Sequence, residues 1–195
     1  MMTKFMKLHP VLLLLSLFLL ANCIAEAQDD IEDKMITCAA KGDYAKVVMY
    51  VEKKGANVNA KNKARWTALA YASKYGHKEV VSYLIKQGAD VNKKINTGET
   101  ALQVALKRGY EDVADILLEN GADVNIKDIV GMTALSWAAK DGNLSMVKYL
   151  IEHGADVNSQ NPAGRTPIEI SMSEEVKQYL RSKGGKTGKE LMYTN

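Results

Sequence analysis

Gly55-Ala56-Asn57-Val58-Asn59 recurs as Gly-Ala-Asp-Val-Asn, and each copy begins thirty-three residues after the previous one. The later copies begin at Gly88, Gly121 and Gly154. A second signature, Thr-Ala-Leu or Thr-Pro-Ile, keeps the same step and begins at Thr67, Thr100, Thr133 and Thr166. A constant period of about 20 to 50 residues is typical of stacked supersecondary units. The repetition therefore predicts a solenoid built from neighbouring copies of one unit.

Each unit carries the signals of two short helices. Thr67 stands where the first helix should begin, because its hydroxyl can accept a hydrogen bond from a free backbone N–H. Gly76 can end that helix and Gly88 the next one, since glycine readily adopts a positive φ. The apolar residues of the run 80–84 fall on one helical face. The residues between the second glycine and the next threonine are expected to form a projecting β-turn or hairpin.

These residues resemble the ankyrin repeat over about Asp30 to Lys186. The resemblance implies an all-α solenoid of stacked helix–turn–helix units with projecting β-turn or hairpin fingers. We expect a repeat domain at residues 28–186, with five units at about 30–63, 64–96, 97–129, 130–162 and 163–186. The first and last units depart from the signatures, as terminal caps should. Residues 187–195 lack the period and are predicted to form a mobile C-terminal tail.

The N-terminal residues 1–27 have the pattern of an export signal. Lys4 and Lys7 precede an apolar run at 11–20, and Ala25-Glu26-Ala27 offers small residues for cleavage before Gln28. This pattern predicts an exported protein, either periplasmic or extracellular. Two alternatives remain: the segment ending at Cys23 resembles a lipobox, although Asn22 departs from it, and the run could also stay uncleaved as an anchor.

Charge and cysteine content narrow the class of protein. Removing residues 1–27 takes away two basic side chains and one acidic side chain, which leaves a nearly balanced charge. Such a balance argues against electrostatically driven binding of nucleic acid. Only Cys38 remains after cleavage, so no internal disulfide can form. We expect a monomer that touches a membrane only if Cys23 is lipidated.

No constellation of residues points to catalysis, a cofactor or a metal. His77 and His153 are far apart, and neither lies in a cluster with metal-ligand spacing. Ser136 and Ser171 have no histidine at a matching position to act as a base. The aspartates of the repeated Gly-Ala-Asp-Val-Asn are expected to cap their own turns. An enzyme is therefore the least expected class of function.

The resemblance implies a recognition surface on the concave side, formed by the finger tips and the exposed face of each first helix. Trp66, Ile129, Val130 and Met132 are apolar residues expected to be exposed there, unless they pack on neighbouring fingers. Basic residues around them suit an acidic protein partner. The predicted partner-binding residues are Lys63, Trp66, Lys74, Tyr75, Glu99, Lys107, Arg108, Ile129, Val130, Met132, Lys140, Asp141 and Arg165.

Two departures from the repeat affect the fingers. Arg65 occupies the place held by Gly98 in the next unit, so the first finger's turn is expected to differ. Only Asp128 keeps the aspartate of the resembled family, so hydrogen bonds between fingers are expected to be fewer. The sequence predicts a non-catalytic protein-binding module of the cell envelope that acts as a chaperone, tether or inhibitor. The alternative is a secreted effector that binds a host or competitor protein.

Overall fold

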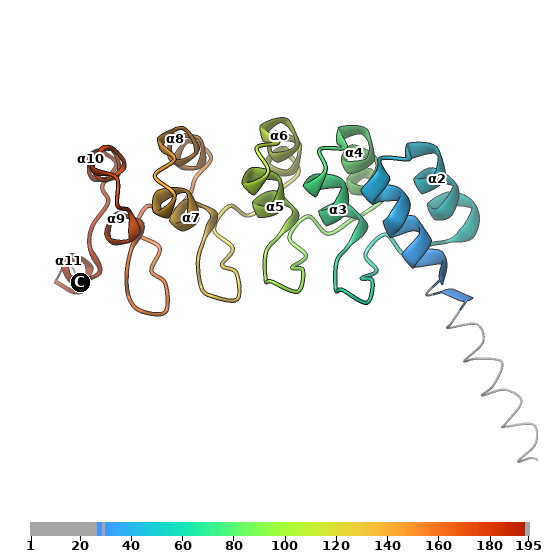
Figure 1. The fold of residues 1–195 in the computed structure, drawn as a ribbon, viewed down its shortest axis with the longest axis horizontal. Helices are drawn as coiled ribbons and strands as arrows, with labels where there is room; N and C mark the ends of the chain where they lie inside the picture. Colours follow the sequence, from blue (N-terminus) through green and yellow to red (C-terminus); the bar gives the residue numbers. More distant parts are fainter. Residues whose placement is uncertain (1–26, 29, 194–195) are drawn as a thin grey trace, which may run out of the picture.

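The protein is an elongated row of helix pairs, as the computed structural model shows (Figure 1). Residues 27–28 and 30–193 are described. The second helices of the units form one layer, the first helices form another, and loops project from the lower layer (Figure 1). In the described ranges there is no strand, and a single β-bridge joins Lys61 and Thr67. The predicted all-α solenoid is confirmed.

The helix pairs follow one another in sequence order. Residues 30–41 form the first helix of the first unit. The remaining elements are α2 (Tyr44–Val48) with the π-helix η1 (Met49–Lys53), α3 (Ala68–Lys74) with α4 (Lys78–Lys86), α5 (Ala101–Lys107) with α6 (Glu111–Glu119), α7 (Ala134–Lys140) with α8 (Leu144–Glu152), α9 (Pro167–Ile170) with α10 (Glu174–Ser182), and α11 (Gly188–Met192).

The repeated threonines and glycines bound the helices as predicted. The Thr67 hydroxyl accepts a hydrogen bond from Ala70 N at the start of α3. At α5 the capping is reciprocal, because Thr100 N also donates to the side chain of Gln103. Gly76 follows the end of α3 with φ +73°, where a residue with a side chain would be strained. Each unit therefore closes its own helix ends.

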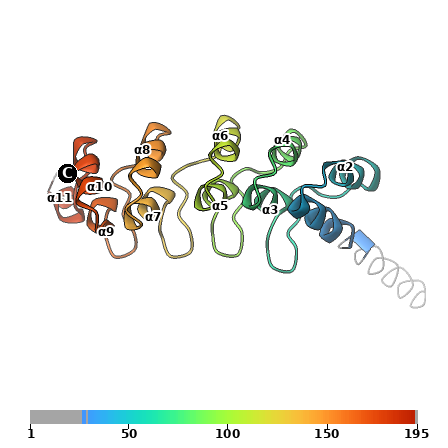
Figure 2. The ribbon, with the colours of Figure 1, turned by 45° about the horizontal axis from the view of Figure 1, so that its top comes forward.

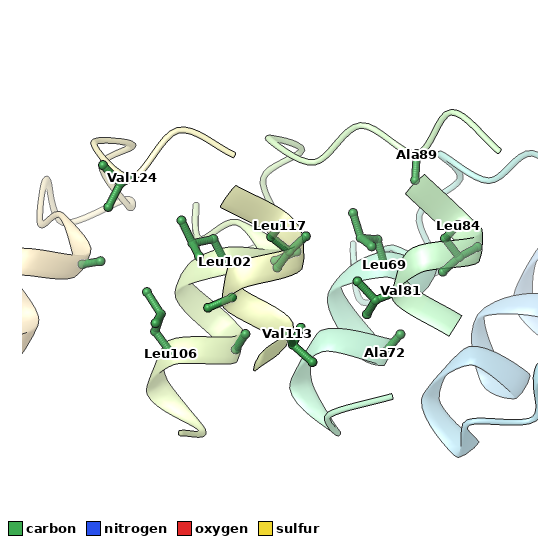
Figure 3. Close-up of a cluster of buried hydrophobic side chains, with 14 of the residues drawn as sticks. Leu69, Ala72, Val81, Leu84, Ala89, Leu102, Leu106, Val113, Leu117 and Val124 are labelled. Carbon is green, nitrogen blue, oxygen red and sulfur yellow. The ribbon is translucent and has the colours of Figure 1, made fainter. Parts of the chain in front are cut away.

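The core runs the length of the stack rather than forming one centre. Leu69 and Leu84 of the second unit and Leu102 and Leu117 of the third have almost no exposed surface. Figure 3 shows these side chains between adjacent helix pairs. Because neither helix of a pair could bury its apolar face alone, the units stabilise one another through this continuous layer.

An asparagine ladder joins successive units, which the sequence had suggested only as turns. The amide of Asn59 donates to Gly88 O over 2.9 Å, and its Oδ1 accepts from Asp90 N at 2.8 Å. Asn92 and Asn125 make the same pair of bonds one and two units later. The aspartates cap locally as predicted, since Asp90 Oδ1 accepts from Asn92 N.

Three of the projecting loops, which we call the first, second and third fingers, turn at residues 62–65, 95–98 and 128–131 and share one type of turn. Arg65 N donates to Asn62 O, just as Gly98 N donates to Ile95 O in the next finger. The expectation that the first finger would differ is wrong, because Arg65 adopts φ +63° and takes up the glycine conformation. Ile129 N donates to Thr97 O over 3.1 Å, which gives one backbone hydrogen bond between neighbouring fingers.

The stack is loosest between the third and fourth units. The backbone of α3 runs close to α5, and that of α7 close to α9, whereas α5 and α7 approach each other at few points. Figures 1 and 2 show the wider separation at this junction. A cavity of about 150 Å³ lies there, between α5 on one side and α7 and α8 on the other.

The C-terminal residues form a structured cap, and the prediction of a mobile tail from residue 187 is wrong for the described part, 187–193. Thr187 and Glu190 cap α11 reciprocally, and Arg181 binds the Glu190 carboxylate. Gly188 N donates to Glu169 over 2.7 Å. Packing is so close that a methyl group at Gly188 would collide with Gly164 O. These contacts hold α11 against the last unit.

The predicted export signal at 1–27 lies outside the described residues except for Ala27, and so does Cys23. Residues 194–195 of the predicted tail also lie outside them. Gln28, the first residue after the predicted cleavage point, bonds Glu32 and Gly55 O through its side-chain amide. Within 27–28 and 30–193, no helix has the length and apolar character needed to cross a membrane.

Candidate functional site

The fingers and first helices place most of the predicted binding residues on one face, which we call the inner face. Thirty-three-residue spacing puts Lys74, Lys107 and Lys140 at the last position of α3, α5 and α7. Ile129 and Val130 stand on the third finger with 73% and 54% of their surface exposed. For these two residues the predicted exposure is confirmed. The other predicted residues that are exposed are Lys63, Tyr75, Lys107, Arg108, Lys140, Asp141 and Arg165.

Met132 is not part of the exposed surface, and its expected exposure is wrong. Only 7% of Met132 is exposed, and its N–H donates to Asp128 Oδ1. Trp66 is half-buried, because its ring packs against a small cluster of Ala70, Ile95 and Val104. Packing within and between the fingers therefore buries part of the apolar surface that the sequence predicted to be free for a partner.

Three aromatic rings surround Lys74 on the second unit. The Trp66 and Tyr71 ring centroids are 4.8 Å apart, and Tyr71 stacks on Tyr75 at 6.5 Å. Lys74 Nζ lies 5.0 Å from the Trp66 ring and 5.3 Å from the Tyr75 ring. Attraction between a cation and aromatic faces is worth about 0.5–1 kcal/mol at exposed sites. The rings thus favour this position of the ammonium group.

Trp137 lies between two lysines of the inner face. Lys107 Nζ of the preceding unit and Lys140 Nζ of the same helix are each 4.6 Å from its ring centroid. Lys107 Nζ also forms an ion pair with Glu99 Oε1 over 2.6 Å. This pair fixes Lys107 over the junction between α5 and α7.

Two hollows flank Lys107. The first, of about 170 Å³, is lined by Trp66, Lys74, Glu99, Val104, Lys107 and Arg108. The second is the cavity between α5 and α7, whose lining includes Leu106, Trp137, Ala138 and Met146. Each hollow has an indole as one wall and Lys107 at its edge. The inner face therefore offers two recesses with mixed apolar and charged linings, in which basic side chains outnumber the carboxylates of Glu99 and Asp141.

Trp137 and Tyr71 were missed by the sequence reasoning. Both occupy the fourth residue of their helix, at the same place in the repeat as Val104. A comparison of that position across units would have found them, since it lies one helical turn before the lysines.

The two histidines of the repeat units and Cys38 have surroundings that suit structural roles. His77 Nε2 lies 3.1 Å from Ala40 O, and His153 Nδ1 lies 2.7 Å from Tyr149 O. Burial raises the pKa of the Cys38 thiol, which makes the reactive thiolate scarcer. Among residues 27–28 and 30–193, no three histidine, cysteine or acidic side chains gather closely enough to hold a metal ion.

Comparisons with known proteins agree with this architecture. A family model described as ankyrin repeats in three copies matches residues 13–95 and again 34–128. A second family model, described as ankyrin repeats in many copies, matches residues 117–171. A search of curated proteins gave no match to the chain.

Proposed function

The chain belongs to the ankyrin repeat family, and from this premise we propose that it is a non-catalytic module that binds a partner protein on its inner face. Ankyrin repeats generally mediate protein–protein interaction, and their domains are typically not catalytic. Our proposal is more specific than the family's general role. The protein binds its partner on the inner face, in the cell envelope, and acts as a chaperone, tether or inhibitor.

The observation that carries the proposal is the exposed pair Ile129 and Val130 beside a row of lysines. A finger tip needs no large apolar side chain for its own turn, because the equivalent positions in the second finger are Asn96 and Thr97. Exposed apolar groups rimmed by polar ones are typical of interaction sites. A specific interface buries about 800 Å² per partner, which several adjacent fingers and helices can supply.

The proposed location rests on the sequence of residues 1–27. A short basic start, an apolar run and a small-residue cleavage motif favour export into the periplasm or the medium. Retention in the envelope fraction would support the envelope binder, and release into the medium would support the secreted effector. Partition of mature protein into a detergent phase would instead support lipidation at Cys23.

The binding face is tested by cross-linked capture of partners in cells that make the protein. The doubly substituted variant Ile129→Asp/Val130→Asp should lose the captured partner while its helicity is unchanged. Met172→Asp is the control for adding a charge at an exposed apolar residue, because Met172 is 87% exposed and lies between α9 and α10 in the last unit, two units after the one that holds α5 and α6. If capture survives in the double variant, the partner uses another face and the proposal is wrong.

A further inference from the structure

We infer that the inner face from Lys74 to Lys140 docks an extended, acidic segment of the partner, with one apolar side chain of that segment in the cavity beside Trp137. The inference rests on the proposed protein-binding function and adds the chemistry of the partner. It follows from three features of the described residues. Lys74, Lys107 and Lys140 form a row that we call the lysine ladder, two of these lysines have no acidic side chain within ion-pair distance, and a cavity lies at the loose junction between α5 and α7.

The lysines form a ladder of prepositioned positive charges. Rings hold Lys74 and Lys140 in place, but an aromatic face does not neutralise an ammonium group as a carboxylate would. Within the described chain, neither lysine lies within ion-pair distance of an acidic side chain, and Lys107 pairs with Glu99 alone. Carboxylates of a partner would therefore meet two ammonium groups, those of Lys74 and Lys140, that rest on aromatic rings and not on carboxylates of the described chain.

The spacing of the ladder matches an extended peptide. Lys107 Nζ and Lys140 Nζ each lie 4.6 Å from the Trp137 ring centroid, so they are no more than about 9 Å apart. Closely stacked helices, such as α3 and α5 below Lys74 and Lys107, pack about 8–10 Å apart. An extended peptide in the polyproline II conformation rises about 3.1 Å per residue and completes a turn every three residues, so every third side chain returns to the same face after about 9 Å. Acidic residues at every third position of such a partner segment would thus face successive lysines. A helical ligand would advance only about 4.5 Å over three residues.

The cavity at the loose junction provides the apolar anchor. Its lining combines Leu106, Ala138 and Met146 with the indole of Trp137. Besides Lys107, the polar side chains of the lining are Gln103, Asp141 and Asn143. A volume of about 150 Å³ is enough to hold a benzene-sized group. The side chain of a leucine, isoleucine or phenylalanine therefore fits this recess. Lys107 at its edge would bind the carboxylate next to the anchor.

A nucleic acid is the rival anionic ligand, and the face suits it less well. Tight binding to a phosphate backbone uses about 6–10 contacts from lysine or arginine. The ladder supplies three lysines, with Arg108 beside them, which is fewer than such binding uses. The apolar cavity has no counterpart in phosphate recognition. Charge and recess together favour an acidic peptide.

The test uses the chain's own fluorescence. Trp66 and Trp137 are the only tryptophans, and each lines one of the hollows. The probe is a synthetic peptide of about 12 residues with glutamate at every third position and one leucine beside the central glutamate. We expect saturable binding by calorimetry and a blue shift of emission, which Trp137→Phe should largely remove because that indole borders the filled cavity.

Reversing the charge of a lysine, and then that of the matching peptide residue, tests whether the two side chains are in contact. Lys140→Glu should weaken peptide binding by about tenfold or more, and a peptide with lysine in place of the matching glutamate should restore it. Lys74→Glu is a second variant with its own matching position. Lys148→Glu is the control, because Lys148 also lies over a ring, that of Tyr179, but on the outer helix α8. Its affinity should equal that of the unsubstituted protein.

Three outcomes would overturn the inference. In the first, a peptide with glutamine in place of glutamate binds as tightly as the glutamate peptide. In the second, Lys140→Glu and Lys148→Glu lose the same amount of peptide affinity. In the third, a single-stranded DNA oligonucleotide binds more tightly than the peptide and displaces it. The proposed function is judged separately by partner capture. If Ile129→Asp/Val130→Asp abolishes capture but the acidic peptide does not bind, the protein-binding face stands and only the chemistry assigned to the partner is wrong.

Discussion

The indole nitrogen of Trp137 donates to Asp128 Oδ2 over 2.8 Å, which ties an inner helix to the finger that precedes it. The other oxygen of Asp128 accepts from Val130 N and Met132 N. A single carboxylate thus shapes the third finger and orients the ring between the two lysines. It links the exposed finger tip to the cavity at the α5–α7 junction.

Asp128→Ala should lower the free energy of unfolding by about 2–3 kcal/mol, because it removes hydrogen bonds to a charged acceptor and leaves partly buried donors unpaired. Urea unfolding measures the loss, and Trp137 emission reports the freed ring. Asp141→Ala is the control, since that exposed side chain should change stability by no more than about 0.5 kcal/mol. Equal losses in the two variants would contradict the role of Asp128.

Arg65→Gly should stabilise the protein. Arg65 has φ +63°, a conformation that costs a residue with a side chain about 1–2 kcal/mol and glycine almost nothing. Part of this gain is lost because glycine is more flexible in the unfolded chain. We expect a net gain of up to about 1 kcal/mol, visible as a higher Tm. An unchanged or lower Tm would show that the first finger carries no strain.

Gly98→Ala provides the opposite case at the equivalent turn. A Cβ there would lie 2.6 Å from Ile129 N of the next finger, and φ is +75°. The change should therefore destabilise the protein by more than the Arg65→Gly change stabilises it. Thermal unfolding of both variants in the same buffer checks the comparison.

Asn92→Ala should weaken the coupling between the second and third units. It removes the bond to Gly121 O at 3.1 Å and the bond from Asp123 N at 2.8 Å. At about 0.5–1.5 kcal/mol for each bond, the free energy of unfolding should fall by about 1–3 kcal/mol. Hydrogen exchange should rise at Asp123 N. Asn96→Ala, an exposed finger substitution, should leave both quantities unchanged.

Acid should release α11 before the rest of the stack unfolds. Hydrogen bonds from Thr187 N and from Arg181 lower the pKa of Glu190 to about 2. Partial burial raises the pKa of Glu169, but bonds from Thr166 N and Gly188 N outweigh it and the net pKa is lowered. Both carboxyls have pKa values below the usual value of about 4.3 for glutamate. Their stabilisation is therefore present above about pH 4.3 and is lost as the pH falls toward 2.

Hydrogen exchange at Gly188 N and Thr187 N measures this release. Both amides should lose protection between about pH 4 and 2, while the buried helices α5 and α6 keep theirs. Glu190→Gln should raise exchange at Thr187 N even at neutral pH, because the neutral amide is a weaker acceptor. Simultaneous loss of protection along the whole chain would show that α11 is not an independent cap.

The framework could be predicted from the sequence because it depends on local rules that repeat. A threonine hydroxyl caps the helix that it begins, as at Thr67, and a glycine such as Gly76 ends it, whatever the neighbouring unit contains. The predicted exposure of Ile129 and Val130 followed from the same register. The same local rules led to the prediction of five units.

What could not be predicted depends on contacts between units. Met132 is buried and Trp66 half-buried because of packing within and between fingers, which the pattern of one unit does not reveal. Residues 187–193 looked aperiodic, yet bonds from Gly188 and Arg181 fold them onto the last unit. The cavity beside Trp137 arises from a loose junction between repeats whose signatures are alike. The binding role of the inner-face residues stays a prediction.

The asparagine ladder recognises main chain only: Asn59, Asn92 and Asn125 each bond a glycine carbonyl and an aspartate amide nitrogen of the following unit. Asn158 makes the same pair of bonds, to Gly184 O and from Lys186 N, so the terminal cap is joined to the last unit in the same way as one unit is joined to the next. In-frame duplication or deletion of one thirty-three-residue unit would preserve every rung. The length of the binding face can therefore evolve, or be engineered, without redesigning the joints.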